Sequence, residues 1–307
     1  MGGGGMALAR LGGQAGRMRL LPALALACLL AGPCRAADLK LATWNLAWLS
    51  LRPAGDPAIP ADVPRREAAD LDRLAGYARR LNADVVALQE VDGPEVAARI
   101  FDARNYRFVF AEENDVQRVG FALHRSLVVT RNPDLAALDV QARSRFSLRR
   151  GVDVTVEAGG QRLRLLAVHL KSSCHDSPLA NASTPQCQAL AAQVPVLAGW
   201  MAERRREGVA FAVLGDFNRR LSPRDEMFQA LSAAAPVVSV AEGYSNPCWA
   251  RANSGGRAFI DHILLGGAAR QWWRRDSLKV MVYTENDPRL REVLSDHCPV
   301  SVQLGLG

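Results

Sequence analysis

The stretch Val209–Asn218, which reads VAFAVLGDFN, decides how the rest of the sequence is interpreted. It begins with a short apolar run that is typical of a buried β-strand. Gly215, Asp216 and Asn218 follow directly, at the point where that strand would end. Because functional side chains are commonly carried where a rigid strand gives way to a loop, this stretch predicts a site at the edge of a sheet.

Five further blocks have the same layout, with polar residues at or just after the end of an apolar run. They are Ala42–Leu46 (ATWNL), Leu88–Val91 (LQEV), Val168–Ser172 (VHLKS), Ile260–Ile263 (IDHI) and Ser295–Val300 (SDHCPV). Together the blocks supply carboxylate and amide oxygens and two histidines, and no cysteine that suits a zinc site. Hard oxygen donors favour Mg²⁺, with Ca²⁺ or Mn²⁺ as alternatives. Such an ion beside imidazoles suits phosphoryl chemistry.

Apolar segments and helical patterns are mixed along the chain. The segments that we interpret as strands are Leu39–Trp44, Asp84–Leu88, Arg107–Phe110, Val119–His124, Val152–Glu157, Leu163–His169, Val209–Leu214, Phe259–Leu265, Leu278–Tyr283 and Val300–Leu304. Amphipathic helical patterns cover Arg65–Leu81, Gly93–Phe101 and Gln186–Glu207, while other strands follow each other through short turns. This mixture predicts an α+β fold with two mixed β-sheets packed face to face.

In their order, the six blocks resemble the endonuclease/exonuclease/phosphatase superfamily, and the resemblance spans Asn45 to Val300. This superfamily includes DNase I-like nucleases, abasic-site endonucleases, neutral sphingomyelinases and inositol-phosphate phosphatases. The resemblance implies a DNase I-like, four-layer α/β/β/α sandwich. It also implies a metal-dependent hydrolase that acts on phosphoric ester bonds.

The resemblance implies a role for each matched residue. The metal ligands that it implies are Asn45, Glu90, Asp216 and Asp296. The catalytic residues that it implies are His169, Asp216, Asn218, Asp261 and His297. Asp216 would orient or deprotonate water or hold a second ion, and Asn218 would donate to a phosphate oxygen. Asp261 would brace His297, which serves as general base or phosphate contact. His169 would face the scissile phosphate and could protonate the leaving oxygen; abasic-site enzymes carry a tyrosine there.

Several positions depart from the DNase I branch or stay open. Gln117 and Arg118 occupy the positions at which the DNase I branch contacts DNA, and Asp92 occupies a position at which that branch has an arginine. The sequence therefore does not specifically predict cleavage of double-stranded DNA. We expect Arg118 and Lys171, together with Asn218, to bind phosphate. We also expect Arg219 and Arg220 to lie where a polynucleotide backbone passes. His262 is expected to be structural, and Trp44 and Trp48 are expected to pack rather than to stack on bases.

The first residues read as a leader. An apolar run at Leu20–Leu30 follows Arg17 and Arg19 and precedes a small-residue stretch, which predicts a signal peptide over residues 1–36 and one domain over 38–307. Met18 is an alternative start to Met1. The run is too short to span a bilayer, so we expect no transmembrane segment and a secreted or periplasmic bacterial protein.

Export favours pairing of the four cysteines that follow the leader. Cys174 and Cys187 bracket a polar loop, so a local bridge is the economical choice and leaves Cys248 with Cys298. The formal charge of +7 also depends on the leader, because its four arginines leave 34 basic and 31 acidic residues in the remainder. Such a small excess argues only weakly for a polyanionic partner.

The leading interpretation is an exported, divalent-metal-dependent phosphodiesterase, most simply a non-specific endonuclease acting on DNA or RNA. The alternative is a phosphodiesterase or phosphatase that acts on lipid headgroups, as sphingomyelinases do, or on small phosphate esters. An exposed aromatic element would favour the lipid alternative, and Trp272–Trp273 is the candidate. The remote alternative is a catalytically silent binding module. We expect nucleic acid as substrate, no stable protein partner and a monomer.

Overall fold

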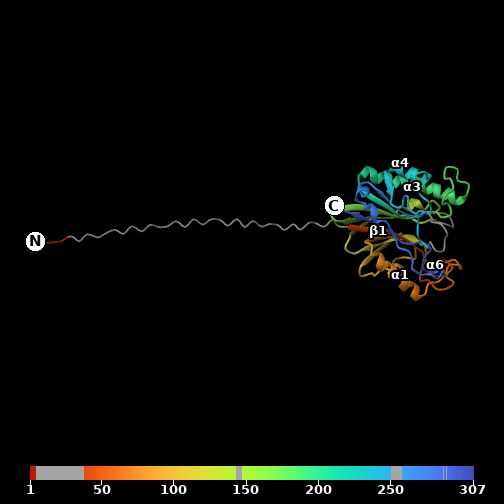
Figure 1. Cartoon of the computed structure of the whole chain (residues 1–307), viewed down its shortest axis with the longest axis horizontal. Helices are drawn as coiled ribbons and strands as arrows, with labels where there is room; N and C mark the ends of the chain where they lie inside the picture. Colours follow the sequence, from red (N-terminus) through yellow and green to blue (C-terminus); the bar gives the residue numbers. More distant parts are fainter. Residues whose placement is uncertain (5–37, 143–146, 250–257, 286, 288) are drawn as a thin grey trace. The chain divides into compact units, whose positions relative to one another are not determined.

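The computed structural model describes residues 1–4, 38–142, 147–249, 258–285, 287 and 289–307. It divides the chain into two units, Met1–Arg35 and Ala36–Gly307. The predicted signal peptide lies almost entirely outside the described residues. No helix in the described part of the chain is long and apolar enough to cross a membrane. The second unit carries the fold and is described below (Figure 1).

One of the two sheets contains the first strand of the fold. Its six strands lie in the order β11-β12-β1-β2-β4-β3. Their bounds are β1 (Asp38–Leu49), β2 (Val85–Val91), β3 (Tyr106–Phe110), β4 (Arg118–His124), β11 (Lys279–Val280) and β12 (Val300–Gly305). Strands β1 and β2 are parallel, and the other neighbours are antiparallel, so the sheet is mixed.

The other sheet is built in the same way. Its six strands lie in the order β5-β6-β7-β8-β10-β9. Their bounds are β5 (Val128–Arg131), β6 (Val152–Ala158), β7 (Gln161–His169), β8 (Ala210–Asp216), β9 (Val237–Ser239) and β10 (Asp261–Gly266). Here β7 and β8 form the parallel pair. The prediction of two mixed sheets is therefore confirmed.

Helices cover the outer face of each sheet. Helices α1 (Ala68–Leu81), α2 (Pro94–Ala97) and α6 (Leu290–Leu294) pack on the sheet of β1, and α3 (Pro185–Glu207) and α4 (Glu226–Ala234) pack on the sheet of β8. Figure 1 shows α1 and α6 on one side of the strands and α3 and α4 on the other. The remaining elements are α5 (Ala269–Trp272) and the 3-10 turns Ala136–Leu138 and Arg275–Ser277. This is the expected four-layer sandwich.

Alternation along the strands explains the layers. In β7, Leu163, Leu165 and Ala167 face the other sheet, while Leu166 and Val168 face the helices. Because both faces are buried, the strand reads as one continuous apolar run, as was seen in the sequence. The apolar run of β7 ends at His169 and that of β8 ends at Asp216, and the site forms at these two strand ends.

Candidate active site

The register of the second sheet brings three predicted site residues together. His169 at the end of β7 lies opposite Asp216 at the end of β8. Asp216 in turn lies opposite Asp261, the first residue of β10. Asn218 follows two residues after Asp216, and its backbone N–H donates to Asp216 Oδ1 at 2.8 Å. Strand pairing alone thus assembles this half of the site.

The first sheet contributes its residues from two irregular strand ends. The pairing of β1 with β2 shifts register after Asn45, and that of β2 with β4 shifts after Leu88. Within the second shift, Glu90 has a φ of 59°. A residue other than glycine adopts this left-handed conformation only rarely and at a cost, and such strain is concentrated at functional positions. Because of this backbone conformation, the Glu90 side chain departs from the regular alternation of side chains between the two faces of the sheet.

Asn45 joins the two halves. Its Nδ2 donates to Glu90 Oε1 and to Asp216 Oδ2, each at 3.1 Å, while its Oδ1 accepts from the Ala47 N–H at 2.9 Å. The side chain is fully buried. Asn45 was predicted to be a metal ligand; in this structure its amide nitrogen faces the two carboxylates and orients them.

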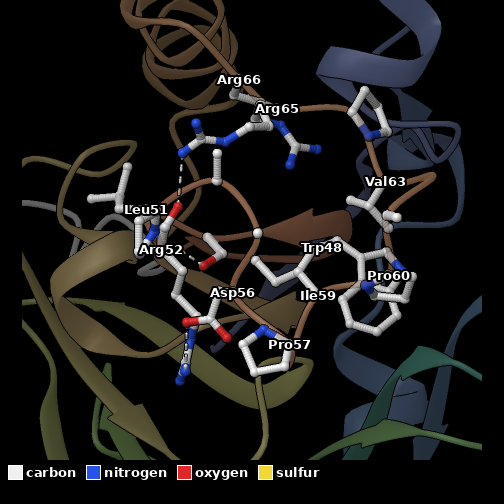
Figure 2. A pocket seen from close by; sticks show the side chains of 16 residues that line it. Trp48, Leu51, Arg52, Asp56, Pro57, Ile59, Pro60, Val63, Arg65 and Arg66 are labelled. Carbon is white, nitrogen blue, oxygen red and sulfur yellow. Dashed lines mark hydrogen bonds and ion pairs between the residues drawn. The ribbon is translucent and has the colours of Figure 1, made fainter.

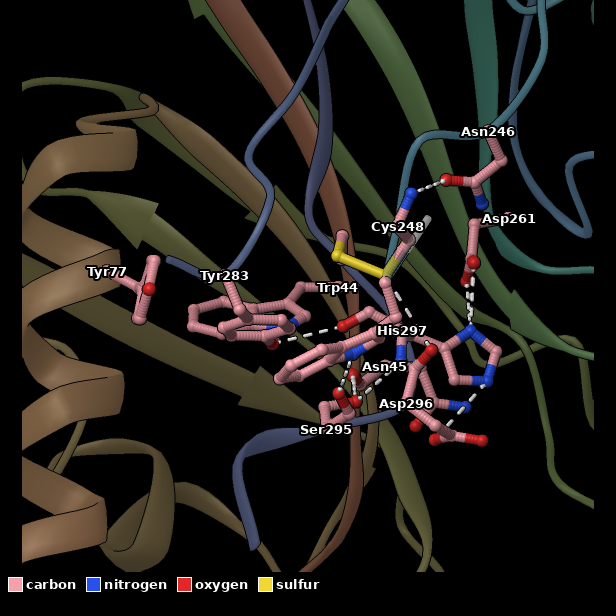
Figure 3. Close-up of a disulfide and its surroundings, with 12 residues drawn as sticks. Trp44, Asn45, Tyr77, Asn246, Cys248, Asp261, Tyr283, Ser295, Asp296 and His297 are labelled. Carbon is pink, nitrogen blue, oxygen red and sulfur yellow. Dashed lines mark hydrogen bonds and ion pairs between the residues drawn. A yellow bond between two sulfur atoms is a disulfide. The ribbon is translucent and has the colours of Figure 1, made fainter. Parts of the chain in front are cut away.

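The two histidines lie on opposite sides of Asp216. His169 Nε2 is 3.7 Å from both Asp216 Oδ2 and Glu90 Oε1. His297 Nδ1 is 2.8 Å from Asp261 Oδ2, and its Nε2 is 3.8 Å from Asp216 Oδ2 and 3.9 Å from Asp296 Oδ1. Figure 3 shows the His297 ring between Asp261 and Asp296. The structure therefore brings together all the predicted catalytic residues.

The surroundings give the two histidines different protonation states. Burial alone would lower the pKa of His297, but the carboxylates of Asp261 and Asp216 outweigh it and hold that pKa well above its usual range. Burial lowers the pKa of His169 well below its usual range, and the cationic side chain of Arg149 lowers it further. At neutral pH, His297 is thus an imidazolium and His169 is neutral. Neighbouring groups whose pKa values are driven apart are typical of acid–base pairs.

Asp216 is buried beside other carboxylates. Burial raises the pKa of Asp216 to about 7; His297 opposes the rise, and the carboxylates of Asp261 and Glu90 add to it. Ligand atoms of Asp216, Asp261 and His297 all lie within 4.8 Å of one another. Further carboxylates lie beside this group: Glu90 Oε1 accepts from the same Asn45 amide as Asp216 Oδ2, and Asp296 Oδ1 is 3.9 Å from His297 Nε2. Carboxylate oxygens of this kind fit Mg²⁺, Ca²⁺ or Mn²⁺.

The predicted phosphate contacts occupy different places. Lys171 lines a cleft of about 660 Å³ together with Trp48, Gln117 and Arg149. Asn218 Nδ2 donates to the Leu170 carbonyl at 3.1 Å and to Asp216 Oδ2 at 3.3 Å, so both amide donors are engaged within the protein. Arg118 is not among the residues that line the cleft of Lys171.

Two arginines differ from the expectations. Arg118 donates to the Asp92 carbonyl at 2.8 Å, so its guanidinium is directed to that backbone segment. Arg219 is buried, pairs with Asp225 at 2.7 Å and donates to the carbonyls of Cys174 and Ser177. The expectation that a polynucleotide passes along Arg219 is wrong, because this side chain is part of the protein interior. Arg220 is half-exposed and pairs with Asp176.

Three residues make contacts in or next to the site that were not predicted. Gln117 Nε2 donates to Glu90 Oε2 at 2.5 Å, and Arg149 donates to Gln117 Oε1, so an arginine supports Glu90 through an amide. Ser295 Oγ donates to the Asn45 carbonyl at 2.8 Å and accepts from the His297 N–H at 3.0 Å. Ser295 opens a recognised block and could have been found there. Arg149 belongs to no recognised motif, so its contact with Gln117 could be found only from the structure.

Both predicted disulfides are present, and one of them adjoins the site. Cys174–Cys187 and Cys248–Cys298 have Cα–Cα distances of 5.1 Å and 5.5 Å. The second joins the loop before Trp249 to the residue after His297 (Figure 3). Trp249 stacks on Tyr283 at 5.0 Å, and the Tyr283 hydroxyl donates to the His297 carbonyl at 3.0 Å. The segment that carries His297 is therefore fixed by a covalent bond and by aromatic packing.

Comparisons with known proteins agree with this arrangement. The family model described as Endonuclease/Exonuclease/phosphatase family matches residues 42–297. Comparison with curated protein sequences gave no match.

Solved structures share the fold at low sequence identity. A truncated Caenorhabditis elegans TDP2 has a TM-score of 0.56 and 17% identity, with 87% of this chain and 98% of that chain covered. A D. rerio TDP2 complexed with a single-strand DNA product has a TM-score of 0.55 and 20% identity, with the same coverage. The human nocturnin catalytic domain with a bound sulfate anion has a TM-score of 0.53 and 14% identity, covering 87% and 93%. At these identities the likeness shows the fold alone.

Proposed function

Because the chain belongs to the endonuclease/exonuclease/phosphatase family, we propose that it is a divalent-metal-dependent phosphodiester hydrolase whose substrate is DNA or RNA. One observation carries this proposal. Asn45 and Glu90 from one sheet and His169 and Asp216 from the other meet at one point, with His297 beside them. A chain that only bound a partner would have no need of such a complete set of acids and imidazoles.

The charges of the two histidines indicate which of them accepts a proton and which donates one. The resemblance gave His169 the role of proton donor and left His297 as base or phosphate contact. His169 is neutral and lies 3.7 Å from Asp216, so it is available to accept a proton from water. The cationic His297, held by Asp261, is suited to bind a phosphate oxygen and to protonate the leaving oxygen.

Glu90, Asp216 and Asp296 would hold the metal ion, for which we propose Mg²⁺. An ion at this place neutralises charge that develops on the phosphate in the transition state. Asn45 keeps two of the carboxylates in position, and Gln117 with Arg149 supports Glu90 from the other side. These contacts keep the carboxylates in one geometry before substrate arrives.

Export is part of the proposal. The predicted leader, together with two disulfides in the folded unit, supports an oxidising compartment outside the cytoplasm. The lipid alternative loses its particular support, because Trp272 and Trp273 are partly buried and pack against the core between the sheets. We propose that the enzyme acts as a monomer.

Circular substrates give a direct test. Purified protein is incubated with circular single-stranded DNA, supercoiled plasmid, RNA and sphingomyelin vesicles, with Mg²⁺ and with a chelator. We expect both circles to be opened, or RNA to be fragmented, only with the metal. Hydrolysis of sphingomyelin with intact nucleic acids would overturn the proposed substrate. Activity that is unchanged by the chelator would overturn the metal mechanism.

A further inference from the structure

A cavity beside the candidate site is formed by the segment that follows β1. It has a volume of about 560 Å³ and is lined by Trp48 and by residues of the stretch 50–66. In Figure 2, Arg65 and Arg66 lie on one side of it and Trp48, Pro57, Ile59 and Pro60 on the opposite side. One wall is thus aromatic and apolar, and the other is cationic. The volume is within the usual range of small-molecule sites.

Trp48 connects this cavity with the candidate site. Its backbone N–H donates to Glu90 Oε2 at 3.1 Å. Its side chain also lines the cleft of Lys171 and a third cavity of about 590 Å³, which includes Asp296. Trp48 therefore lies beside both Glu90 and the cavity of Asp296, where a group attached to a phosphate at these residues would extend.

The backbone around Trp48 is strained. Ala47 and Trp48 have φ values of 45° and 57°, so two consecutive residues adopt the left-handed conformation. For a bulky side chain this is a rare conformation that costs energy. The Trp48 side chain is half-buried, so burial in a core does not explain the strain. Strain of this kind persists where it serves a function.

The arginines of the cavity differ in how they are used. Arg52 pairs with Asp92 at 2.7 Å and with Asp56 at 3.5 Å. Arg66 donates to backbone carbonyls of β1 and α6, including those of Leu46 and Leu294. Arg65 is exposed and donates to the Arg52 carbonyl, and within the described ranges no carboxylate lies at ion-pair distance from it. Arg65 is therefore the cation that remains open to an anion.

We propose that this cavity is a nucleotide subsite: the base next to the scissile phosphate stacks on Trp48, and Arg65 contacts the following phosphate. An aromatic side chain beside a cation is a common way to hold single-stranded nucleic acid without sequence preference. This inference rests on the proposed function and names the part of the substrate that the site selects. It also replaces the expectation that Trp48 serves only in packing.

Two chromogenic diesters with the same leaving group test the subsite. Thymidine 5′-(4-nitrophenyl phosphate) carries a nucleoside, whereas methyl 4-nitrophenyl phosphate carries only a methyl group. For Trp48→Ala we expect kcat/KM on the thymidine ester to fall about tenfold, mainly through KM, and that on the methyl ester to stay within about twofold. Trp48→Phe should restore most of the loss, because a phenyl ring still stacks.

A matched control tests whether the loss of any exposed aromatic side chain would lower the activity on the thymidine ester. Tyr244 is an exposed aromatic residue and is not among the lining residues of the cavities described above. Tyr244→Ala should change neither substrate. Equal losses on both esters for Trp48→Ala would overturn the subsite, because Trp48 would then act only through Glu90. Circular dichroism and thermal unfolding check that each variant is folded.

Binding provides a readout that does not need turnover. Calorimetry with Mg²⁺ measures the Kd of thymidine 5′-monophosphate, of thymidine 3′,5′-bisphosphate and of inorganic phosphate. Trp48→Ala should weaken the nucleotide about fivefold or more and leave phosphate unchanged. Arg65→Gln should leave thymidine 5′-monophosphate unchanged, because this ligand has no following phosphate, and should weaken thymidine 3′,5′-bisphosphate about fivefold or more. Equal affinity of the wild type and of Trp48→Ala for the nucleotide would overturn the subsite. Nucleotide binding without cleavage of either ester would retain the subsite and contradict the proposed reaction.

Discussion

Glu90 is the single side chain on which the proposed mechanism depends most. It contacts Asn45, Gln117 and the Trp48 N–H, and it lies 3.7 Å from His169. We expect Glu90→Gln to reduce turnover at least about a thousandfold in the presence of Mg²⁺, because a charged oxygen ligand is lost. Steady-state kinetics on a chromogenic diester measures the effect, and the thermal midpoint should change little.

Glu112→Gln is the matched control for the loss of a carboxylate. Glu112 is exposed, and its carboxylate pairs with Arg131 at 3.1 Å. Its replacement should leave turnover within about twofold, since a surface ion pair contributes little. Wild-type turnover in Glu90→Gln would show that Glu90 is not a metal ligand.

Glu113 makes stability depend on pH. Burial raises its pKa to about 7, although the Arg150 N–H opposes the rise. The folded state therefore holds the proton more tightly than the unfolded state, so stability is full below the unfolded pKa near 4.5 and falls as pH rises to about 7. Glu113→Gln cannot lose this proton. Its thermal midpoint should match or fall below that of the wild type at pH 4.5 and exceed it at pH 8; the same difference at both values would exclude Glu113 as the cause.

The residues of the site differ in how far sequence could predict them. Asp216, Asp261 and His297 belong to short blocks at strand ends, and parallel and antiparallel pairing brings such ends together. Arg149 and Trp48 could not be assigned in this way. The role of Arg149 depends on a loop that crosses to Gln117, and that of Trp48 depends on two left-handed backbone conformations. Neither leaves a periodic or compositional signal.

At the scale of elements, the two disulfides should differ in their effects. Cys248–Cys298 closes a separation of 50 residues and Cys174–Cys187 one of 13, which correspond to about 4 and about 3 kcal/mol of stability by the chain-entropy model. We expect the double Cys→Ala variant at Cys248 and Cys298 to lose most of its activity even below its unfolding transition, because Cys298 follows His297.

The other double variant, at Cys174 and Cys187, is the control. It should unfold at lower temperature than the wild type and keep most of its activity while folded. The activities of the wild type and the two double variants are compared at a temperature at which chemical denaturation shows that all three proteins are folded. Equal residual activity in the two double variants would show that the bridge beside His297 does not position it.

Central elements were predicted well, and edges poorly. Strands buried on both faces, such as β7 and β8, read as continuous apolar runs and were found. The edge strands β5 and β9 were missed because they are short and only partly buried. The segment Leu278–Tyr283 was predicted as one strand, but only Lys279–Val280 pairs with β12. Beyond it, Tyr283 turns inward to Trp44, Tyr77 and Trp249.

At the scale of the whole molecule, salt separates a polynucleotide substrate from a small one. A long nucleic acid releases counterions when cationic side chains bind several phosphates, so its apparent affinity should fall steeply between about 50 and 200 mM salt. A small diester should show only modest screening. Arg220→Gln should reduce the slope by about 0.7 to 0.9, as expected for one lost phosphate contact.

Arg162→Gln is the control for that slope. Like Arg220, Arg162 is solvent-exposed and ion-paired, in its case with Glu157 at 3.3 Å, but it lies near the start of β7, far along the strand from His169. It should leave the slope unchanged. Equal slopes for the wild type and Arg220→Gln would remove Arg220 from the path of the nucleic acid.

Under the proposed export, the bond between Cys248 and Cys298 would leave this molecule inactive where it is synthesised. In a reducing cytoplasm the bond stays open, and the segment that carries His297 lacks its covalent anchor. A nuclease in this state would not cleave the genome and transcripts of the cell that makes it. Oxidation of the two cysteines after export would then activate it. We expect bacteria to tolerate leaderless protein in a reducing cytoplasm and to be harmed by it in an oxidising one. Equal growth in both hosts would contradict this form of self-protection.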